Sequence, residues 1–307
     1  MNNTIKNYLN NTHAILFAFI ALYTLIILIS ASIPMFWDME YISKISNHIY
    51  DNNFSSLIFS DTDSGATPLY STYLAVLWVI FGKSLFVNHI AILPFVTGIL
   101  FQYYKLANRF LDKKYVVFSF IILLLEPTIT SQTILAGYDL VFCFLFLFGL
   151  NSVFDNNRYK IALSVIAMPL LNSRGFSLVC SIFLIDFYIN SAGYSNIKKF
   201  LKNIAAYLPA IIFLIVWLLY HYMSTGWFIV SGSRERFHHI SGLEEIFRNL
   251  IYIAWKINDF GRVVIYFVIF ILAYKVIKSN KSTSKKHINS ASLRGFYRSN
   301  PIIAILV

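Results

Sequence analysis

The fold is decided by residues 14–41, which read AILFAFIALYTLIILISASIPMFWDMEY. The first twenty of these residues, up to Ile33, carry no charge. As a helix they would extend about 30 Å, the thickness of a bilayer's hydrocarbon core. Ionised groups beside lipid are costly and usually face a polar cavity. Five carboxylates nevertheless follow directly, which predicts a membrane helix leading into an acidic, functional segment: Asp38, Glu40, Asp51, Asp61 and Asp63.

The composition of the 307 residues is that of a polytopic membrane protein. Hydrophobic residues make up 58 %, charged residues 13 %, and the mean hydropathy is +0.65, whereas a soluble domain is about one-quarter charged. The net charge of +11 is spread in short clusters between apolar runs, so it follows membrane topology and not a nucleic-acid surface. Cys143 and Cys180 both lie in apolar runs, which argues against a disulfide framework or a cysteine metal cluster.

The topology depends on one short apolar run, residues 68–81. The run opens with proline, is followed by Gly82, and is short for a span. If it does not cross and the N-terminus is inside, seventeen of the 25 Lys and Arg residues lie on the inner side; if it crosses, only eight do. The positive-inside rule favours the first arrangement. We therefore expect a juxtamembrane or re-entrant helix on the outer side, which then carries eleven of the fourteen Asp and Glu residues.

The remaining apolar runs predict an all-α, polytopic transmembrane helical protein with about eight spans. They lie near residues 85–104, 115–125, 138–154, 161–171, 176–190, 204–223 and 263–277. We expect residues 1–307 to form a single transmembrane domain, with 37–84 as its first outer loop. The first run has no cleavage pattern after it and is expected to be an uncleaved signal anchor. The last residues, PIIAILV at 301–307, read as the first turn of a further span, which predicts a truncated chain.

Four motifs occur in order along the first two-thirds of the chain. They read WDMEY at 37–41, TPLYSTYLAVLWVIFG at 67–82, EPTITSQTILAGYDL at 126–140 and LNSRG at 171–175. Together they resemble motifs of the GT-C membrane glycosyltransferases, specifically the protein O-mannosyltransferase and aminoarabinose-transferase group (glycosyltransferase family 39-like). The resemblance covers roughly residues 14–190. One residue is inserted between Asp38 and Glu40 relative to the family's acidic motif.

The resemblance implies a GT-C fold and a sugar donor linked to polyprenyl phosphate. The acceptor would be a protein, lipid or glycan on the extracytoplasmic side. Such an enzyme must deprotonate the acceptor, a task for a carboxylate, and stabilise charge on the phosphate, a task for a cation. Two positions depart from the family. Ala66 and Thr67 stand where it usually has Lys or His followed by proline, and His89 lies where many relatives have arginine, whose role it could serve in part.

The acidic candidates each have a functional and a structural interpretation. Asp38 is the candidate catalytic base, or else a solvated helix end. Glu40 is expected to orient a partner group or bind substrate. Asp61 and Asp63 lie in the turn SDTDSG and either bind substrate or cap the next helix. A divalent cation between these two carboxylates is a weaker alternative; otherwise we expect no cofactor and no metal. Asp139 either caps the helix that follows or, as the resemblance implies, faces the cavity that holds the substrates.

For each basic candidate, contact with the donor's phosphate is one of two interpretations. Arg174 is the only cation of its short outer turn, and an unpaired arginine there would be costly. It should therefore meet the phosphate or a carboxylate. Arg234 and Arg236 lie in SGSRERFHH, read as a headgroup-facing loop with phosphate contact as the second interpretation. The adjacent pair His238 and His239 is unsuited to hold a metal, because neighbouring residues rarely chelate together.

Two other functions remain open from sequence alone. One is a transporter or flippase of lipid-linked sugars, which would be expected to show mid-helix charges and paired broken helices. The other is a non-catalytic, truncated relative of the transferases. For the transferase we expect a bacterial inner-membrane protein with a cytoplasmic N-terminus and an extracytoplasmic active site.

Overall fold

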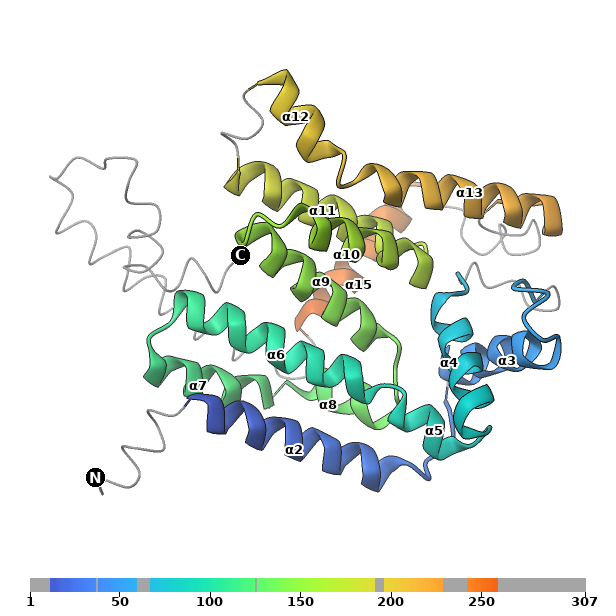
Figure 1. The fold of residues 1–307 in the computed structure, drawn as a ribbon, viewed down its shortest axis with the longest axis horizontal. Coiled ribbons are helices and arrows are strands. Elements are labelled where there is room, and N and C mark those ends of the chain that lie inside the picture. Colours follow the sequence, from blue (N-terminus) through green and yellow to red (C-terminus); the bar gives the residue numbers. More distant parts are fainter. Residues whose placement is uncertain are drawn as a thin grey trace, which may run out of the picture.

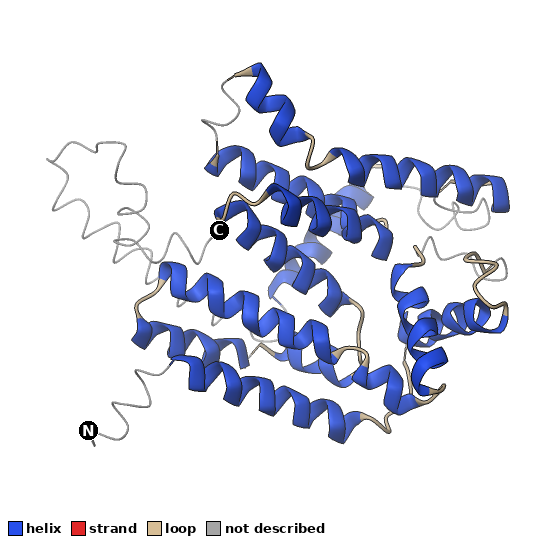
Figure 2. Ribbon diagram, viewed as in Figure 1, coloured by secondary structure: helices blue, strands red, loops and turns tan. Residues whose placement is uncertain are grey.

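The computed structural model describes residues 12–36, 38–59, 67–124, 126–190, 196–228 and 242–258. Within these ranges it contains helices and no strands (Figure 2), which confirms the predicted all-α class. The helices are α2 (Thr12–Ser30), α3 (Asp38–Asp51), α4 (Leu69–Phe81), α5 (Leu85–Ile90), α6 (Leu93–Phe110), α7 (Lys113–Leu124), α8 (Pro127–Ile134), α9 (Asp139–Phe154), α10 (Arg158–Leu171), α11 (Gly175–Ile189), α12 (Ile197–Ile204), α13 (Leu208–Thr225) and α15 (Leu243–Asn258).

The body of the protein is a set of helices whose axes run in nearly the same direction (Figure 1). Helix α9 packs against α6, α10 and α11, while α2 packs against α6 and α13 against α10. The short helices α3, α4 and α5 gather at one end of this body, called here the α3 end. Helix α12 lies at the opposite end, called here the α12 end. Successive body helices alternate in direction, so α2 and α10 finish at the α3 end, and α6, α9 and α11 begin there.

Three helical stretches of the described residues are long and apolar enough to cross a membrane: His13–Ser30, Leu85–Phe110 and Leu208–Thr225. The second of these includes both α5 and α6. A fourth span is possible if Tyr115–Leu123 and Pro127–Ile134, which meet at 55°, act as one. The sequence predicted about eight spans over the whole chain. Helices α9 and α11 are shorter, with 16 and 15 residues, and at 1.5 Å per residue they fall below the hydrocarbon thickness of about 30 Å. Residues 263–277 and 301–307 lie outside the described ranges.

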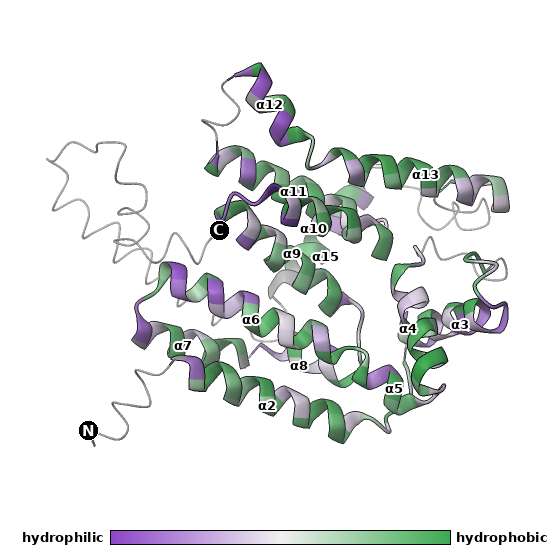
Figure 3. Ribbon diagram, viewed as in Figure 1, coloured by the Kyte–Doolittle hydropathy of each residue, from purple (hydrophilic) through white to green (hydrophobic). Residues whose placement is uncertain are grey.

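Helix α4 corresponds to the short run at 68–81. It begins after Pro68 and ends at Gly82, whose φ of +83° stops the helix in a conformation that favours glycine. The helix packs against α3 and α5. Because α2 finishes and α6 begins at the same end of the body, α4 connects them without running through it (Figure 1). Hydrophilic residues concentrate on α3 and at the α12 end, and the helices between them are largely apolar (Figure 3).

The body helices approach closely where side chains are small. A Cβ on Gly149 of α9 would lie 2.5 Å from Ser164 Oγ of α10 and 2.5 Å from Ile182 of α11. Ser164 Oγ donates to the carbonyl of Leu145 at 2.8 Å. Small residues and interhelical hydrogen bonds are the usual means of association for helices that lack a hydrophobic driving force in lipid. This packing fixes α9, α10 and α11 relative to one another.

Buried polar groups fix the α12 end. Asp186 of α11 is fully buried and accepts from Arg158, from Tyr207 Oη at 2.9 Å and from Asn190 Nδ2 at 2.7 Å. These partners lie at the start of α10, before α13 and at the end of α11. The same end carries Asp155, which accepts from two basic side chains of α6, Lys105 and Arg109. These interactions fix the helices relative to one another at the α12 end, and the same helices carry the connections at the α3 end.

Candidate functional site

The candidate site lies at the α3 end of the body. It is built from three connections that are distant in sequence: the start of α3, the α8–α9 turn and the α10–α11 turn. Alternating helix directions bring these connections to the same end. The start of α3 supplies Asp38, the α8–α9 turn supplies Tyr138 and Asp139, and the α10–α11 turn supplies Asn172 and Arg174.

Tyr138 is the residue around which the charged groups gather. It is buried and precedes the first turn of α9. Burial raises the pKa of its phenol, and the charges of Asp139 and Asp38 raise it further, whereas Arg174 and a hydrogen bond from Asn172 oppose the change. A charge acts on a neighbour's pKa only over short range in protein. The charges of two carboxylates and one guanidinium therefore act on the same phenol.

Asp139 links the two other charged groups. Its carboxylate interacts electrostatically with both Arg174 and Asp38. It is the first residue of α9, while Tyr138 occupies the N-cap position and provides no side-chain cap. The structural interpretation of Asp139 as the N-cap of this helix is therefore wrong. The residue is exposed at the start of the helix.

Asn172 organises the turn that presents Arg174. Its Nδ2 donates to Tyr138 Oη at 3.4 Å, while its Oδ1 accepts from the backbone N–H of Arg174 at 3.1 Å. Ser173 Oγ also donates to this Oδ1, at 3.3 Å. One amide side chain thus connects the α10–α11 turn to the α8–α9 turn. Arg174 itself is exposed and immediately precedes the first residue of α11.

Gly175 is required by the close approach of α11 to α10. A Cβ at this position would lie 2.1 Å from the carbonyl oxygen of Met168 and 2.9 Å from the nitrogen of Pro169. Both are backbone atoms of α10 and cannot move aside as a flexible side chain would. The glycine therefore sets the position of Arg174, one residue earlier, relative to α10.

Asp38, Asp139 and Arg174 form no ion pair with any residue in the part of the chain that the structure describes. There, no Lys, Arg or His nitrogen lies within 4.0 Å of a carboxylate oxygen of Asp38 or Asp139, and Arg174 has no such partner. The groups are near enough to interact and far enough apart to leave their hydrogen-bonding capacity for a ligand. This is an arrangement that suits binding better than internal bracing.

Aromatic side chains of α4 and α6 form the wall behind Tyr138. The ring of Tyr70 lies 6.2 Å from that of Tyr138 and 6.4 Å from that of Phe95, and Tyr73 lies 5.5 Å from Phe95. Tyr70 is 1 % exposed, and its hydroxyl has no hydrogen-bond partner among the described residues. The α4 segment that the sequence placed near the site thus contributes an apolar wall with one buried hydroxyl.

The structure brings together three of the predicted site residues: Asp38, Asp139 and Arg174. Glu40 is exposed on α3 and pairs with Lys44 at 2.7 Å. His89 is fully buried, and its Nε2 lies 2.9 Å from the carbonyl oxygen of Ile33. No described interaction joins either residue to the three, so their substrate-binding roles stay predictions. The other candidates, Asp61, Asp63, Arg234 and Arg236, lie outside the described residues.

Sequence reasoning missed two members of the site, Tyr138 and Asn172. Both lie inside quoted motifs, directly before Asp139 and two residues before Arg174. Their own signals were weak, because tyrosine is abundant in this chain, with 20 copies, and asparagine is common in turns.

No group of three His, Cys, Asp or Glu side chains that could hold a metal ion occurs among the described residues.

No family model matches the chain, and neither a curated protein nor a solved structure matches it.

Proposed function

We propose that this chain is a membrane glycosyltransferase that moves a sugar from a polyprenyl-phosphate donor to an acceptor at the α3 end. The observation that carries the proposal is the meeting of Asp38, Asp139 and Arg174 around Tyr138. A reaction at a lipid phosphate needs a carboxylate for the acceptor and a cation for the phosphate. The order of the four motifs and their resemblance to GT-C transferases support the same reaction.

Asp38 is proposed as the general base. It is exposed at the beginning of α3, directly after the first candidate span, where an acceptor hydroxyl has access from water. Asp139 interacts with Arg174 and would orient that guanidinium. The two carboxylates thereby have different tasks: Asp38 takes the acceptor's proton as the sugar is transferred, and Asp139 positions the cation.

Arg174 is proposed to hold the donor's phosphate. Its guanidinium can donate two parallel hydrogen bonds to phosphate oxygens. The residue also stands at the N-terminus of α11, a helix of 15 residues, where the helix dipole favours an anion. The bond that breaks is the one between the sugar's anomeric carbon and the phosphate oxygen, and the negative charge left on that phosphate would be stabilised by Arg174.

The proposal is tested by turnover of purified protein in nanodiscs. A panel of sugars linked to undecaprenyl phosphate is incubated with native membranes as the acceptor source, and the release of undecaprenyl phosphate is measured. Asp38→Asn keeps the shape and removes the basicity, so turnover should fall about 100-fold or more. Glu244→Gln, on the exposed start of α15, is the matched control and should keep full turnover. Absence of turnover with every donor, or equal rates for Asp38→Asn and the parent, would refute the proposal.

A further inference from the structure

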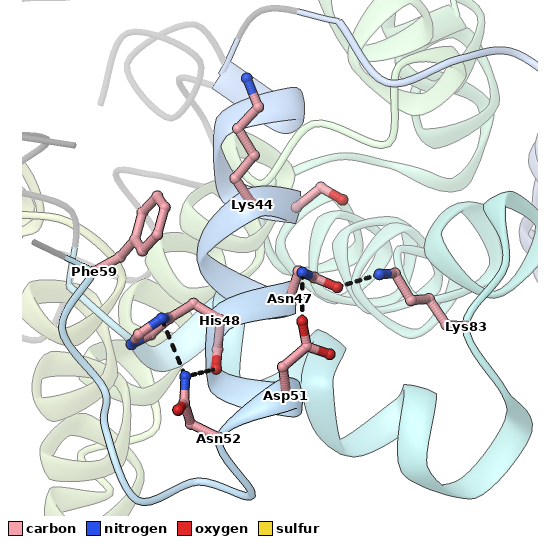
Figure 4. Close-up of a pocket in the computed structure, with 8 residues that line it drawn as sticks. Lys44, Asn47, His48, Asp51, Asn52, Phe59 and Lys83 are labelled. Carbon is pink, nitrogen blue, oxygen red and sulfur yellow. Dashed lines mark hydrogen bonds between the residues drawn. The ribbon is translucent and has the colours of Figure 1, made fainter. Parts of the chain in front are cut away.

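A second polar site lies on α3, away from the candidate active site. It is an open hollow of about 480 Å³ between α3, the loop that follows it and the α4–α5 turn (Figure 4). Asp51 of the hollow ends the helix that Asp38 begins, and lies thirteen positions later, about 20 Å along the helix axis. No residue of the hollow belongs to the group around Tyr138. The hollow is lined mainly by hydrogen-bonding side chains, among them Lys44, Asn47, His48, Asp51 and Lys83, with one aromatic ring, Phe59.

The polar groups of the hollow are held in place by one another. Lys83 Nζ donates to Asn47 Oδ1, and Asn47 Nδ2 donates to Asp51 Oδ2 at 2.7 Å. The amide of Asn47 is thus fixed between an ammonium group and a carboxylate, as Figure 4 shows. A ligand would meet groups that are already oriented, which lowers the entropy cost of binding.

The loop that carries Phe59 is also fastened to α3. Asn52 Nδ2 lies 2.8 Å from the carbonyl oxygen of His48 and 3.2 Å from its Nδ1. On the other side of the imidazole, Nε2 lies 3.2 Å from Ser56 Oγ. The Phe59 ring then lies 5.2 Å from the imidazole. These bonds hold an aromatic surface at the edge of the hollow.

The charges of the hollow compensate each other. Lys44 pairs with Glu40 at 2.7 Å, and Lys83 reaches Asp51 through the amide of Asn47. Among the described residues, the two lysines of the hollow are therefore matched by Asp51 of the hollow and by Glu40, which lies one helical turn before Lys44. A site for phosphate or another strong anion would need cations in excess. The hollow instead offers donors and acceptors in balance, which suits a neutral ligand with many hydroxyl groups.

We propose that this hollow binds a neutral saccharide. Each sugar hydroxyl both donates and accepts, so it can use the carboxylate of Asp51, the amides of Asn47 and Asn52 and the ammonium of Lys83 together. The apolar C–H face of a sugar ring can lie against Phe59. A volume of about 480 Å³ has room for one or two sugar units. The inference does not depend on the proposed transferase; in such an enzyme the hollow would hold an acceptor glycan.

The test is binding of the full-length protein, in nanodiscs, to an array of neutral oligosaccharides built from hexoses and N-acetylhexosamines. We expect at least one neutral oligosaccharide to bind. Asn47→Ala and Phe59→Ala should each weaken that binding about tenfold or more. Phe86→Ala and Asn108→Ala, at exposed positions outside the hollow, are the matched controls and should bind as the parent does. Thermal unfolding of each variant separates a lost contact from a lost fold.

Two further measurements distinguish a saccharide site in the hollow from binding at the candidate active site and from an anion site. Asp38→Asn should bind the oligosaccharide normally, since Asp38 lies outside the hollow, even though its turnover is expected to fall about 100-fold or more. Inorganic phosphate at equal concentration should not displace the sugar. The inference is overturned if no neutral oligosaccharide binds, if phosphate displaces it, or if folded Asn47→Ala and Phe59→Ala bind as well as the controls.

Discussion

Burial raises the pKa of the Tyr138 phenol, and the carboxylate of Asp38, one hundred residues earlier in the chain, raises that pKa further. The relationship joins the start of α3 to the start of α9. It does so because α2 and α9 run in opposite directions through the body, so one ends where the other begins (Figure 1). Arg174 completes the group from a third connection. The charges of two carboxylates and a guanidinium from three connections thus act on the same phenol.

Arg174→Lys and Arg174→Ala test the proposed phosphate contact. A lysine cannot reproduce the two parallel hydrogen bonds of a guanidinium. We expect the KM for the donor to rise about tenfold in Arg174→Lys and further in Arg174→Ala, while dependence on the acceptor stays the same. The measurement is initial turnover rate against donor concentration.

A purely structural Arg174 would give a different result. Its loss would then lower protein yield and the melting temperature together with turnover. Lys160→Gln, an exposed cation at the α12 end, is the control for the loss of one positive charge. An abundant, stable Arg174→Ala protein with an unchanged KM for the donor would rule out the phosphate contact.

Cysteine labelling tests the sidedness that the bundle implies. In a background with Cys143→Ala and Cys180→Ala, single cysteines are introduced at Ser55, Ser173 and Asn108, all exposed. Ser55→Cys and Ser173→Cys lie at the α3 end and should react with an impermeant maleimide from outside. Asn108→Cys lies near the end of α6 and should react only after permeabilisation. Labelling of Ser55→Cys and Ser173→Cys from opposite sides would mean that α4 crosses the membrane.

Gly175→Ala should destabilise the α10–α11 turn. The added methyl group would lie 2.1 Å from the carbonyl oxygen of Met168, so the two helices must separate. Overpacking of this kind typically costs about 1–3 kcal/mol. The melting temperature in detergent should fall by several degrees. Gly242→Ala, where nothing lies within 4 Å of the new methyl group, is the control and should melt as the parent does. Equal melting of both variants would contradict the close approach.

The contribution of Asp155 should depend on pH. Burial opposes its ionisation, but hydrogen bonds and charges from Lys105 and Arg109 outweigh burial and lower the pKa of the carboxyl. The folded pKa therefore lies below the unfolded value, which is about 3.9. Stabilisation is complete above that unfolded value and is lost as the pH falls through the folded pKa. Asp155→Asn should melt below the parent at pH 7, with the difference shrinking below about pH 4. A difference that is constant from pH 7 to pH 3 would contradict this ionic contribution.

The sequence predicted the helical class and placed Asp38, Asp139 and Arg174 on one side of the protein, for identifiable reasons. Uncharged runs and their basic flanks define helices and their directions, and these directions bring Asp38, Asp139 and Arg174 together. The pattern could not give the number of spans, because an apolar run of 16 residues, such as α9, suits a membrane or a protein interior equally. It could not identify Asn172 either, because the role of that residue depends on a contact with Tyr138, 34 positions away. The hollow on α3 was missed for the same reason, since Lys83 and Asn47 meet only after folding.

Asp186→Asn should be among the most destabilising single substitutions in the described part of the chain. The side chain of Asp186 is fully buried, that of Arg158 is 17 % exposed, and their ion pair joins α11 to α10. The same carboxylate accepts from Tyr207 and Asn190. Breaking a buried pair by changing one partner typically costs about 3–5 kcal/mol, because the other charge stays in a poor environment.

Thermal unfolding in detergent measures this cost against an exposed pair. Glu245→Gln removes the carboxylate that Arg248 contacts at 3.4 Å on α15, and exposed pairs of this kind contribute at most about 1 kcal/mol. The double variant Arg158→Met with Asp186→Leu should recover part of the stability lost in Asp186→Asn, since it removes both charges and keeps apolar volume. If Asp186→Asn melts no earlier than Glu245→Gln, the buried ion pair does not brace the α12 end. The placement of the α10–α11 turn would then rest on the contact between Gly175 and Met168, the packing around Gly149 and the hydrogen bond from Asn172 to Tyr138.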